Sequence, residues 1–190
     1  MKLLLFRSTS VMPLRFKQRG NFTVEFAVVG VALSFMFVFS ADVIIKLSIR
    51  GKLDRLSYSL VNVLKERTQL YDEDYVITQN EANTIFTIAQ NSLRRMQQSY
   101  KDKNFGGVVE ELTFRGIGNP NAPRRYNFGG YACPLAQTIN QFDYLSVVTT
   151  WTRQATLYRV TLCYNTDNMF GSLVNESYTN VSSSSIMIGR

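Results

Sequence analysis

The sequence predicts an α+β protein: a long N-terminal transmembrane helix packed on a small antiparallel-sheet domain with one further helix. Three observations support this prediction. A run of twenty residues, 26–45, is largely apolar and interrupted by a charge only at Asp42. Apolar residues continue at helical spacing beyond that run. Short stretches rich in β-branched and aromatic residues then follow in the C-terminal half, as expected for strands.

The first twenty residues form a basic segment without an acidic residue. They hold five of the 21 lysines and arginines, so the rest of the chain carries 16 basic against 14 acidic residues, +2 of the total charge of +7. Basic charge beside an apolar run is typical of the cytoplasmic flank of a membrane segment. A nucleic-acid-binding protein would more often carry its basic residues on the folded domain, among aromatic ones. We therefore expect no nucleic-acid partner.

The apolar run is long enough to cross a membrane. Twenty helical residues extend about 30 Å, the thickness of the hydrocarbon core of a bilayer. A core helix of a soluble protein is rarely apolar on every face over such a length. Lys46, Arg50, Lys52 and Arg55 follow the run closely, so flanking charge favours a cytoplasmic N-terminus only weakly. We expect a single pass, contact with membrane lipid and an extracytoplasmic C-terminal domain.

The long helix is predicted to continue beyond the membrane. A narrow apolar stripe follows the run at gaps of three and four residues. Its members are Leu53, Leu56, Leu60, Val63 and Leu64. The predicted organisation is therefore a basic segment over 1–20, a long helix over 21–70 with its membrane part at about 26–45, and an extracytoplasmic α+β domain over 71–190.

The C-terminal domain is predicted to contain a second helix and several strands. Thr78 and Glu81 fit a capping box at the start of a helix over residues 79–99. Periodicity and composition then predict the strands. These lie at 108–114, 145–152, 157–164 and 178–188, with a Gly/Pro/Asn/Arg loop between the first two.

The two cysteines, Cys133 and Cys163, both lie in the predicted extracytoplasmic domain. An even number of cysteines beyond a membrane anchor indicates a disulfide in an oxidising compartment. Such a bond would contribute about 3–4 kcal/mol on the chain-entropy model. The alternative is a pair of unbonded, buried thiols that act as small apolar side chains.

The composition argues against an enzyme. The chain contains no histidine, which removes His-dependent triads, His-ligated metals and imidazole acid–base chemistry. Glu110 and Glu111 are neighbours on a predicted strand, so their side chains face opposite sides and cannot act as a pair. We expect no catalytic residue, cofactor or metal site, although a histidine-free enzyme using carboxylates stays an open alternative.

A charged residue stands at the head of the apolar run, in Gly20-Asn21-Phe22-Thr23-Val24-Glu25-Phe26. A carboxylate at the edge of a membrane helix is costly unless it is compensated. Glu25 would be compensated by the helix macrodipole, or by the new amine of Asn21 if the chain is cut after Gly20. It would also be tolerated outside the hydrocarbon in an uncut anchor, and a secretory signal peptide cut before Ala41 is the other alternative.

A glycine followed by five residues ending in Glu, and then an aromatic, resembles the prepilin processing site. The resemblance implies that a prepilin peptidase cuts after Gly20 on the cytoplasmic side. It also implies that Glu25 aids insertion of the subunit beside the N-terminus of the previous one. The pair Glu25-Phe26 resembles the tight adherence (Tad) branch, where it is often Glu-Tyr; Phe26 departs by lacking the hydroxyl.

Three segments of the C-terminal half carry a further resemblance, at residues 157–164, 168–171 and 183–190. They are similar to the TadF family of minor pilins. The TadE family shares the N-terminal design, so both families stay open. The resemblance implies a minor pilin or pseudopilin of the bacterial cytoplasmic membrane, with a periplasmic domain. Its expected role is biogenesis of the adhesive Flp pilus without catalytic activity. The expected partners are the prepilin peptidase, a TadE-like minor pilin and other Tad subunits.

Overall fold

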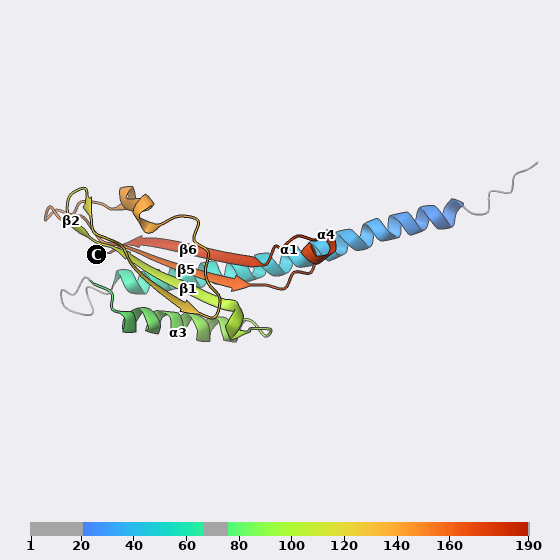
Figure 1. The fold of residues 1–190 in the computed structure, drawn as a ribbon, viewed down its shortest axis with the longest axis horizontal. Helices are drawn as coiled ribbons and strands as arrows, with labels where there is room; N and C mark the ends of the chain where they lie inside the picture. Colours follow the sequence, from blue (N-terminus) through green and yellow to red (C-terminus); the bar gives the residue numbers. More distant parts are fainter. Residues whose placement is uncertain (1–20, 67–75, 190) are drawn as a thin grey trace, which may run out of the picture. The chain divides into compact units, whose positions relative to one another are not determined.

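The computed structural model describes residues 21–66 and 76–189 (Figure 1). Gly20 and the rest of the basic segment, together with residues 67–75, lie outside the described part of the chain. The chain divides into two compact units, Met1–Val38 and Phe39–Arg190. The α+β class predicted from the sequence is confirmed, with a long apolar N-terminal helix, an antiparallel sheet and a further helix.

The long helix, α1 (Asn21–Lys65), runs without a break for 45 residues. No proline interrupts it, and its two internal glycines, Gly30 and Gly51, each cost only about 1 kcal/mol relative to alanine. The described helix ends at Lys65, and residues 67–70 of the range predicted for it lie outside the described part of the chain. Its N-terminal part is long and apolar enough to cross a membrane, and it is the one such helix in the described residues.

A four-stranded antiparallel sheet forms the centre of the second unit, in the order β4-β1-β5-β6. Its strands are β4 (Arg124–Gly129), β1 (Phe105–Leu112), β5 (Leu157–Asn165) and β6 (Asn180–Ile188). A short ribbon of β2 (Phe114–Gly116) and β3 (Asn119–Pro120) extends from it. The central strands β1 and β5 are buried along nearly their whole length, whereas β4 is mostly exposed.

One strand prediction is wrong, and the loop predicted after residue 114 contains β3, β4 and part of β2. Residues 145–152, predicted as a strand, form the end of a 3₁₀ helix, η2 (Ile139–Leu145), and a loop. Val147 and Val148 are exposed there, so their β-branched side chains have no sheet surface to pack on. Strand β4 was predicted as loop because its arginines, asparagine and glycine are typical of loops. Its side chains do alternate, but only Tyr126 and Phe128 pack on the core.

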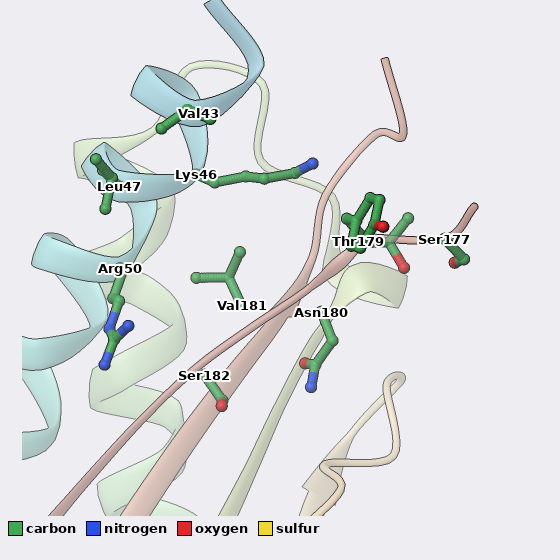
Figure 2. Close-up of a pocket in the computed structure, with 10 residues that line it drawn as sticks. Val43, Lys46, Leu47, Arg50, Ser177, Thr179, Asn180, Val181 and Ser182 are labelled. Carbon is green, nitrogen blue, oxygen red and sulfur yellow. The ribbon is translucent and has the colours of Figure 1, made fainter. Parts of the chain in front are cut away.

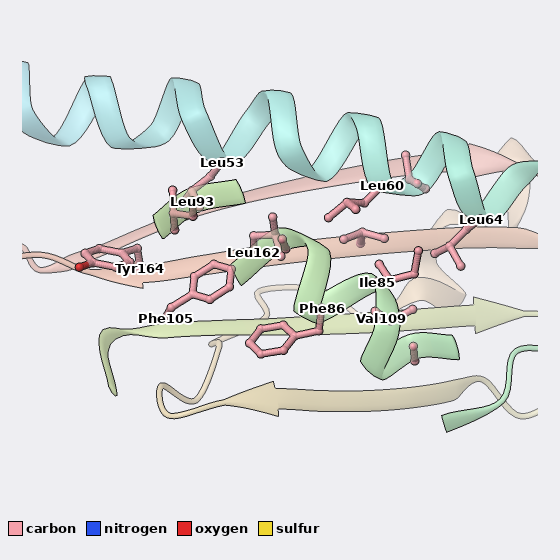
Figure 3. Packing of buried hydrophobic residues seen from close by; sticks show 14 of the residues in the cluster. Leu53, Leu60, Leu64, Ile85, Phe86, Leu93, Phe105, Val109, Leu162 and Tyr164 are labelled. Atoms are coloured by element: carbon pink, nitrogen blue, oxygen red, sulfur yellow. The ribbon is translucent and has the colours of Figure 1, made fainter. Parts of the chain in front are cut away.

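The helices cover one face of the sheet. The second half of α1 and the helix α3 (Gln79–Met96) both pack on it, and Figure 3 shows the interleaved side chains. Strand β5 turns every second residue towards this face. The core contributed by α1, α3 and the sheet includes Leu53, Leu60, Ile85, Leu93, Val109 and Leu162. Each fully buried aliphatic side chain stabilises the fold by about 1.5–3 kcal/mol.

Helix α3 begins with the predicted capping box. The hydroxyl of Thr78 accepts from the backbone N–H of Glu81 at 3.4 Å, and the Glu81 carboxylate accepts from the N–H of Thr78 at 2.7 Å. The helix ends at Met96, three residues before its predicted end, because Gln97 adopts an extended backbone conformation. Phe86 of α3 stacks on Phe105, with ring centroids 5.2 Å apart.

The opposite face of the sheet is covered by the long β4–β5 connection, residues 130–156. Its 3₁₀ helix η2 places Ile139 in a small apolar cluster with Leu112 and Leu157. This cluster is separate from the larger core beneath the helices. The sheet is therefore covered on both faces, by helices on one side and by a structured loop on the other.

Candidate assembly segment and its supporting domain

The first part of α1 presents an apolar surface of unusual extent. Nearly all side chains of residues 22–38 are exposed, and most of them are large and apolar. These include Phe22, Val24, Phe26, Val28, Val31, Phe35, Met36 and Phe37. A soluble surface rarely carries so large a contiguous apolar area, so this segment requires lipid or other apolar helices around it.

Three of the predicted processing residues lie in the described part of the chain. Asn21 is the first residue of α1, and Glu25 and Phe26 follow in its first two turns. Phe26 stacks on Phe22, with ring centroids 6.3 Å apart. Gly20, at the predicted cut, lies outside the described residues. Asn21 and Glu25 are four residues apart, a spacing that places both on one face of a helix.

Asp42, the acid within the apolar run, is buried on the side of α1 that faces the domain. Lys46 donates to its Oδ2, with Nζ and Oδ2 2.5 Å apart. The two residues are one helical turn apart, so a local ion pair compensates the charge that interrupts the run. Sequence reasoning treated Asp42 only as an interruption, although the i,i+4 spacing to Lys46 could have indicated the pair.

A disulfide joins Cys133 to Cys163, with a Cα–Cα distance of 5.6 Å. Cys163 lies on the central strand β5, on the face away from the helices, and Cys133 belongs to the β4–β5 connection. The bond therefore ties this connection to the middle of the sheet.

A buried ion pair holds the same connection. Glu110 of β1 and Arg159 of β5 are cross-strand neighbours, both buried, and the guanidinium donates to the carboxylate. Arg159 also donates to the carbonyl oxygen of Gln137 at 2.9 Å. Its guanidinium carbon lies 5.6 Å from the centroid of the Phe142 ring. Sequence reasoning missed Arg159, because no local pattern indicates which residue of a distant strand will face Glu110.

Glu111 faces the other side of the sheet, as the alternation predicts. Its two carboxylate oxygens each lie 3.2 Å from the backbone nitrogen of Ile77, which donates to them at the entrance to α3. The hydroxyl of Tyr126 donates to the Ile77 carbonyl oxygen at 2.9 Å. Glu110 and Glu111 thus hold two different structural elements. Within residues 21–66 and 76–189, no group of three or more His, Cys, Asp or Glu residues is placed to hold a metal ion.

Hydroxyl groups fix α1 to the edge strand β6. Ser57 of α1 is fully buried, and its Oγ lies 3.1 Å from Oγ of Ser183 and 2.9 Å from Oγ of Ser185. The alternate residue, Ser184, points to the other face and bonds to Thr161 at 2.9 Å. The run Ser182–Ser185 is therefore a strand whose hydroxyls serve both faces of the sheet.

Ionisable groups with shifted pKa values gather where α3 meets β1. Arg94 and Gln90 both donate to the Asp102 carboxylate, and the hydrogen bond from Arg94 is the main cause that lowers the pKa of Asp102. Burial raises the pKa of Tyr100 to about 12. Burial also raises the pKa of Tyr164, whose hydroxyl accepts from the N–H of Lys101 at 3.0 Å. These groups fasten the turn after α3.

An exposed apolar helix that continues into the core of a small α+β domain is the construction of a pilin-type subunit. The model of the TadF family, described as "Putative tight adherence pilin protein F", matches residues 13–190. The chain therefore belongs to the TadF family, which decides between the TadE-like and TadF-like alternatives. No curated protein and no solved structure matched the chain.

Proposed function

We propose that this protein is a minor pilin or pseudopilin required for biogenesis of the adhesive Flp pilus. The observation that carries the proposal is α1 itself: its first part exposes large apolar side chains, while its second part is built into the domain core. Such a helix can pass from a bilayer into a bundle of like helices while the domain stays folded. The subunit acts through assembly and has no catalytic activity of its own.

The proposed maturation begins in the cytoplasmic membrane. A prepilin peptidase cuts after Gly20 and leaves Asn21 with a free amine. That amine lies one helical turn from Glu25, or beside the Glu25 of a neighbouring subunit, and neutralises a carboxylate at the edge of the hydrocarbon. The domain stands on the periplasmic side, where an oxidising environment supports the bond between Cys133 and Cys163.

Lateral association of apolar helices is the proposed assembly step. The partners are a TadE-like minor pilin and other subunits of the Tad machinery or pilus. Gly30 lies in the exposed part of α1, and apart from the neighbouring residues and backbone of its own helix, no described atom lies within 4 Å of the position where its Cβ would stand. A small residue at such a position allows a second helix to approach closely.

The maturation step is tested by mass spectrometry of the protein from its native membrane. We expect a mature N-terminus at Asn21. A start at Ala41 would indicate an ordinary signal peptide, and a start at Met1 an uncleaved anchor; either result contradicts the proposal.

The assembly step is tested by Glu25→Ala, with Asp54→Ala as the matched control. Asp54 is an exposed acid on the same helix, outside the apolar run. We expect both variants to be processed normally, and only Glu25→Ala to lose surface pili in electron micrographs. Unaltered piliation in Glu25→Ala would remove the proposed role of this carboxylate.

A further inference from the structure

The segment between β5 and β6, residues 166–179, exposes more apolar surface than a connecting loop needs. It contains the short helix α4 (Gly171–Val174) and is called the β5–β6 connection below. Leu173 is 59% exposed and Tyr178 55% exposed, and Met169 and Val174 of the same connection are exposed as well. A contiguous apolar patch on a small domain usually marks a contact surface.

Hydrogen bonds give this connection a defined conformation. Asn168 donates from Nδ2 to the carbonyl oxygen of Glu176 at 2.6 Å, and its Oδ1 accepts from the N–H of Tyr178 at 3.3 Å. Asn175 closes α4 with a left-handed conformation, φ 57°. A Cβ at Gly171 would lie 2.1 Å from Asn168 Oδ1, so only glycine fits there. The exposed apolar side chains of the connection are therefore presented by a loop of defined conformation.

The connection lies beside the end of the apolar run of α1. The ring of Phe170 packs edge-on against that of Phe39, with centroids 4.9 Å apart, and Figure 1 shows α4 next to α1. Phe39 stands six residues before Ile45, the end of the run, which corresponds to about 9 Å along the helix axis. Leu173 and Val174 consequently lie at the level of the last turns of the apolar segment.

A cleft of about 520 Å³ opens beside the connection, between α1 and the start of β6. Figure 2 shows Lys46 extending from α1 towards the segment that leads into β6, with Arg50 one turn further on. None of the ten residues lining the cleft is acidic, although Lys46 also holds Asp42. Asp167 and Glu176 belong to the connection but lie outside the lining. Cations and hydroxyls just beyond an apolar segment are placed to bind lipid phosphates.

We propose that the β5–β6 connection is a membrane-contacting segment. Met169, Leu173 and Val174 enter the boundary between headgroups and acyl chains, and Arg50 binds lipid phosphates at the cleft while Lys46 stays paired with Asp42. This inference rests on the membrane anchorage in the proposed function. A bilayer is the occupant because the connection adjoins residues 39–45, the end of the apolar run, through the contact of Phe170 with Phe39. The domain is thereby held against the membrane until the subunit is assembled.

The test uses tryptophan fluorescence of the full chain in vesicles of phosphatidylethanolamine and phosphatidylglycerol. The native tryptophan, Trp151, is the single one in the sequence and is 79% exposed. It precedes β5, whereas the connection follows β5, a strand about 30 Å long. In a Trp151→Phe background, we expect Leu173→Trp to show a blue shift and loss of intensity with brominated lipids. The loss of intensity is expected to be greatest when bromine lies near the headgroups. In the unsubstituted chain, Trp151 is expected to keep its intensity.

A probe within the apolar run separates this inference from the proposed function. In the same background, Phe37→Trp reports whether α1 crosses the bilayer, because bromine deep in the acyl chains then quenches it. Quenching of Phe37→Trp without quenching of Leu173→Trp overturns the inference and leaves the anchorage intact. Absence of quenching at both positions overturns the anchorage as well. Val174→Trp provides a second probe should Leu173→Trp fail to fold.

Two further comparisons complete the test. A blue shift of Leu173→Trp that develops only as more protein is packed into each vesicle indicates a second copy of the chain on the patch, and overturns the proposal. Arg50→Gln, introduced beside Leu173→Trp, is expected to reduce the headgroup-level quenching, whereas Arg153→Gln at the other end of β5 leaves it unchanged. Equal quenching in the two variants overturns the role of the cleft.

Discussion

At the scale of single residues, the buried pair of Glu110 and Arg159 has a large energetic consequence. Both side chains are buried between the sheet and the β4–β5 connection, and they pair across neighbouring strands. Desolvation of two charges offsets most of their attraction, so the pair adds little net stability compared with apolar residues of similar volume. Loss of one partner, however, leaves the other charged and buried.

Arg159→Met is therefore expected to destabilise the protein by about 3–5 kcal/mol, because it leaves the Glu110 carboxylate without its partner. The double variant Glu110→Met, Arg159→Met is expected to recover most of that loss. Both are measured by chemical denaturation of the full chain in detergent. If the single and double variants lose equal stability, the contacts of Arg159 with the Phe142 ring and the Gln137 carbonyl matter more than its ion pair with Glu110.

The stability of the folded protein is expected to depend on pH through Asp102. Hydrogen bonds from Arg94 and Gln90 lower the pKa of Asp102 in the folded state. At pH values between this lowered pKa and the unfolded pKa of about 4, Asp102 binds more protons in the unfolded chain than in the folded one. The stabilisation is present above pH of about 4 and is lost as the pH falls through the folded pKa. Asp102→Asn is expected to remove this acid-side dependence, as measured by unfolding at a series of pH values. An unchanged profile would show that other carboxylates dominate.

At the scale of elements, the β4–β5 connection depends on a bond and an ion pair rather than on regular structure. It contributes η2 and one isolated bridge, between Val148 and Gln154. The disulfide at Cys163 and the bonds of Arg159 fix it to the middle of β5. Residues 145–152, one of the predicted strands, thus belong to a connection that is held in place by tertiary contacts.

Reduction of the disulfide, or Cys133→Ala with Cys163→Ala, is expected to cost about 3–4 kcal/mol on the chain-entropy model. The effect should be local in the native state: amide hydrogen exchange should accelerate over residues 130–156, while α3 keeps its protection because its core is independent of the bond. Hydrogen exchange followed by mass spectrometry measures both. Equal acceleration in α3 would indicate that the two faces of the sheet unfold together.

At the scale of the whole molecule, the two units have different requirements. The core of the second unit draws its first α1 residue from Ile49, well after the boundary at Val38. Residues 22–38 instead expose their apolar side chains. One unit is therefore stabilised by its own core, and the other needs a lipid or protein environment.

Removal of residues 1–38 is accordingly expected to leave a domain that folds without detergent, with its disulfide formed and a cooperative thermal transition. Circular dichroism and calorimetry on this truncated chain check the expectation. A domain that fails to unfold cooperatively would show that the first part of α1 contributes to the core, contrary to the burial pattern.

Much of this architecture could be predicted from the chain alone, because it is local. The apolar run, the stripe from Leu53 to Leu64, the capping box at Thr78 and three of the strands are periodic or adjacent patterns, and the structure has them in place. Strand β4 and the loop at 145–152 were predicted wrongly, because polar composition hid one alternation and β-branched residues imitated another. The predicted cut at Gly20 falls outside the described residues and stays a prediction.

The sequence by itself determined the long apolar N-terminal helix, the α+β class and the resemblance to Tad pilins. The tertiary structure decided which distant groups meet: Glu110 with Arg159, 49 positions apart, Ser57 with Ser183, 126 positions apart, and Phe39 with Phe170. The physical reason is that helical and strand periodicity is set by residues close together in the sequence. Strand register and helix docking instead depend on how the whole chain packs. The position of the β5–β6 connection beside the end of the apolar run is likewise decided by the tertiary structure.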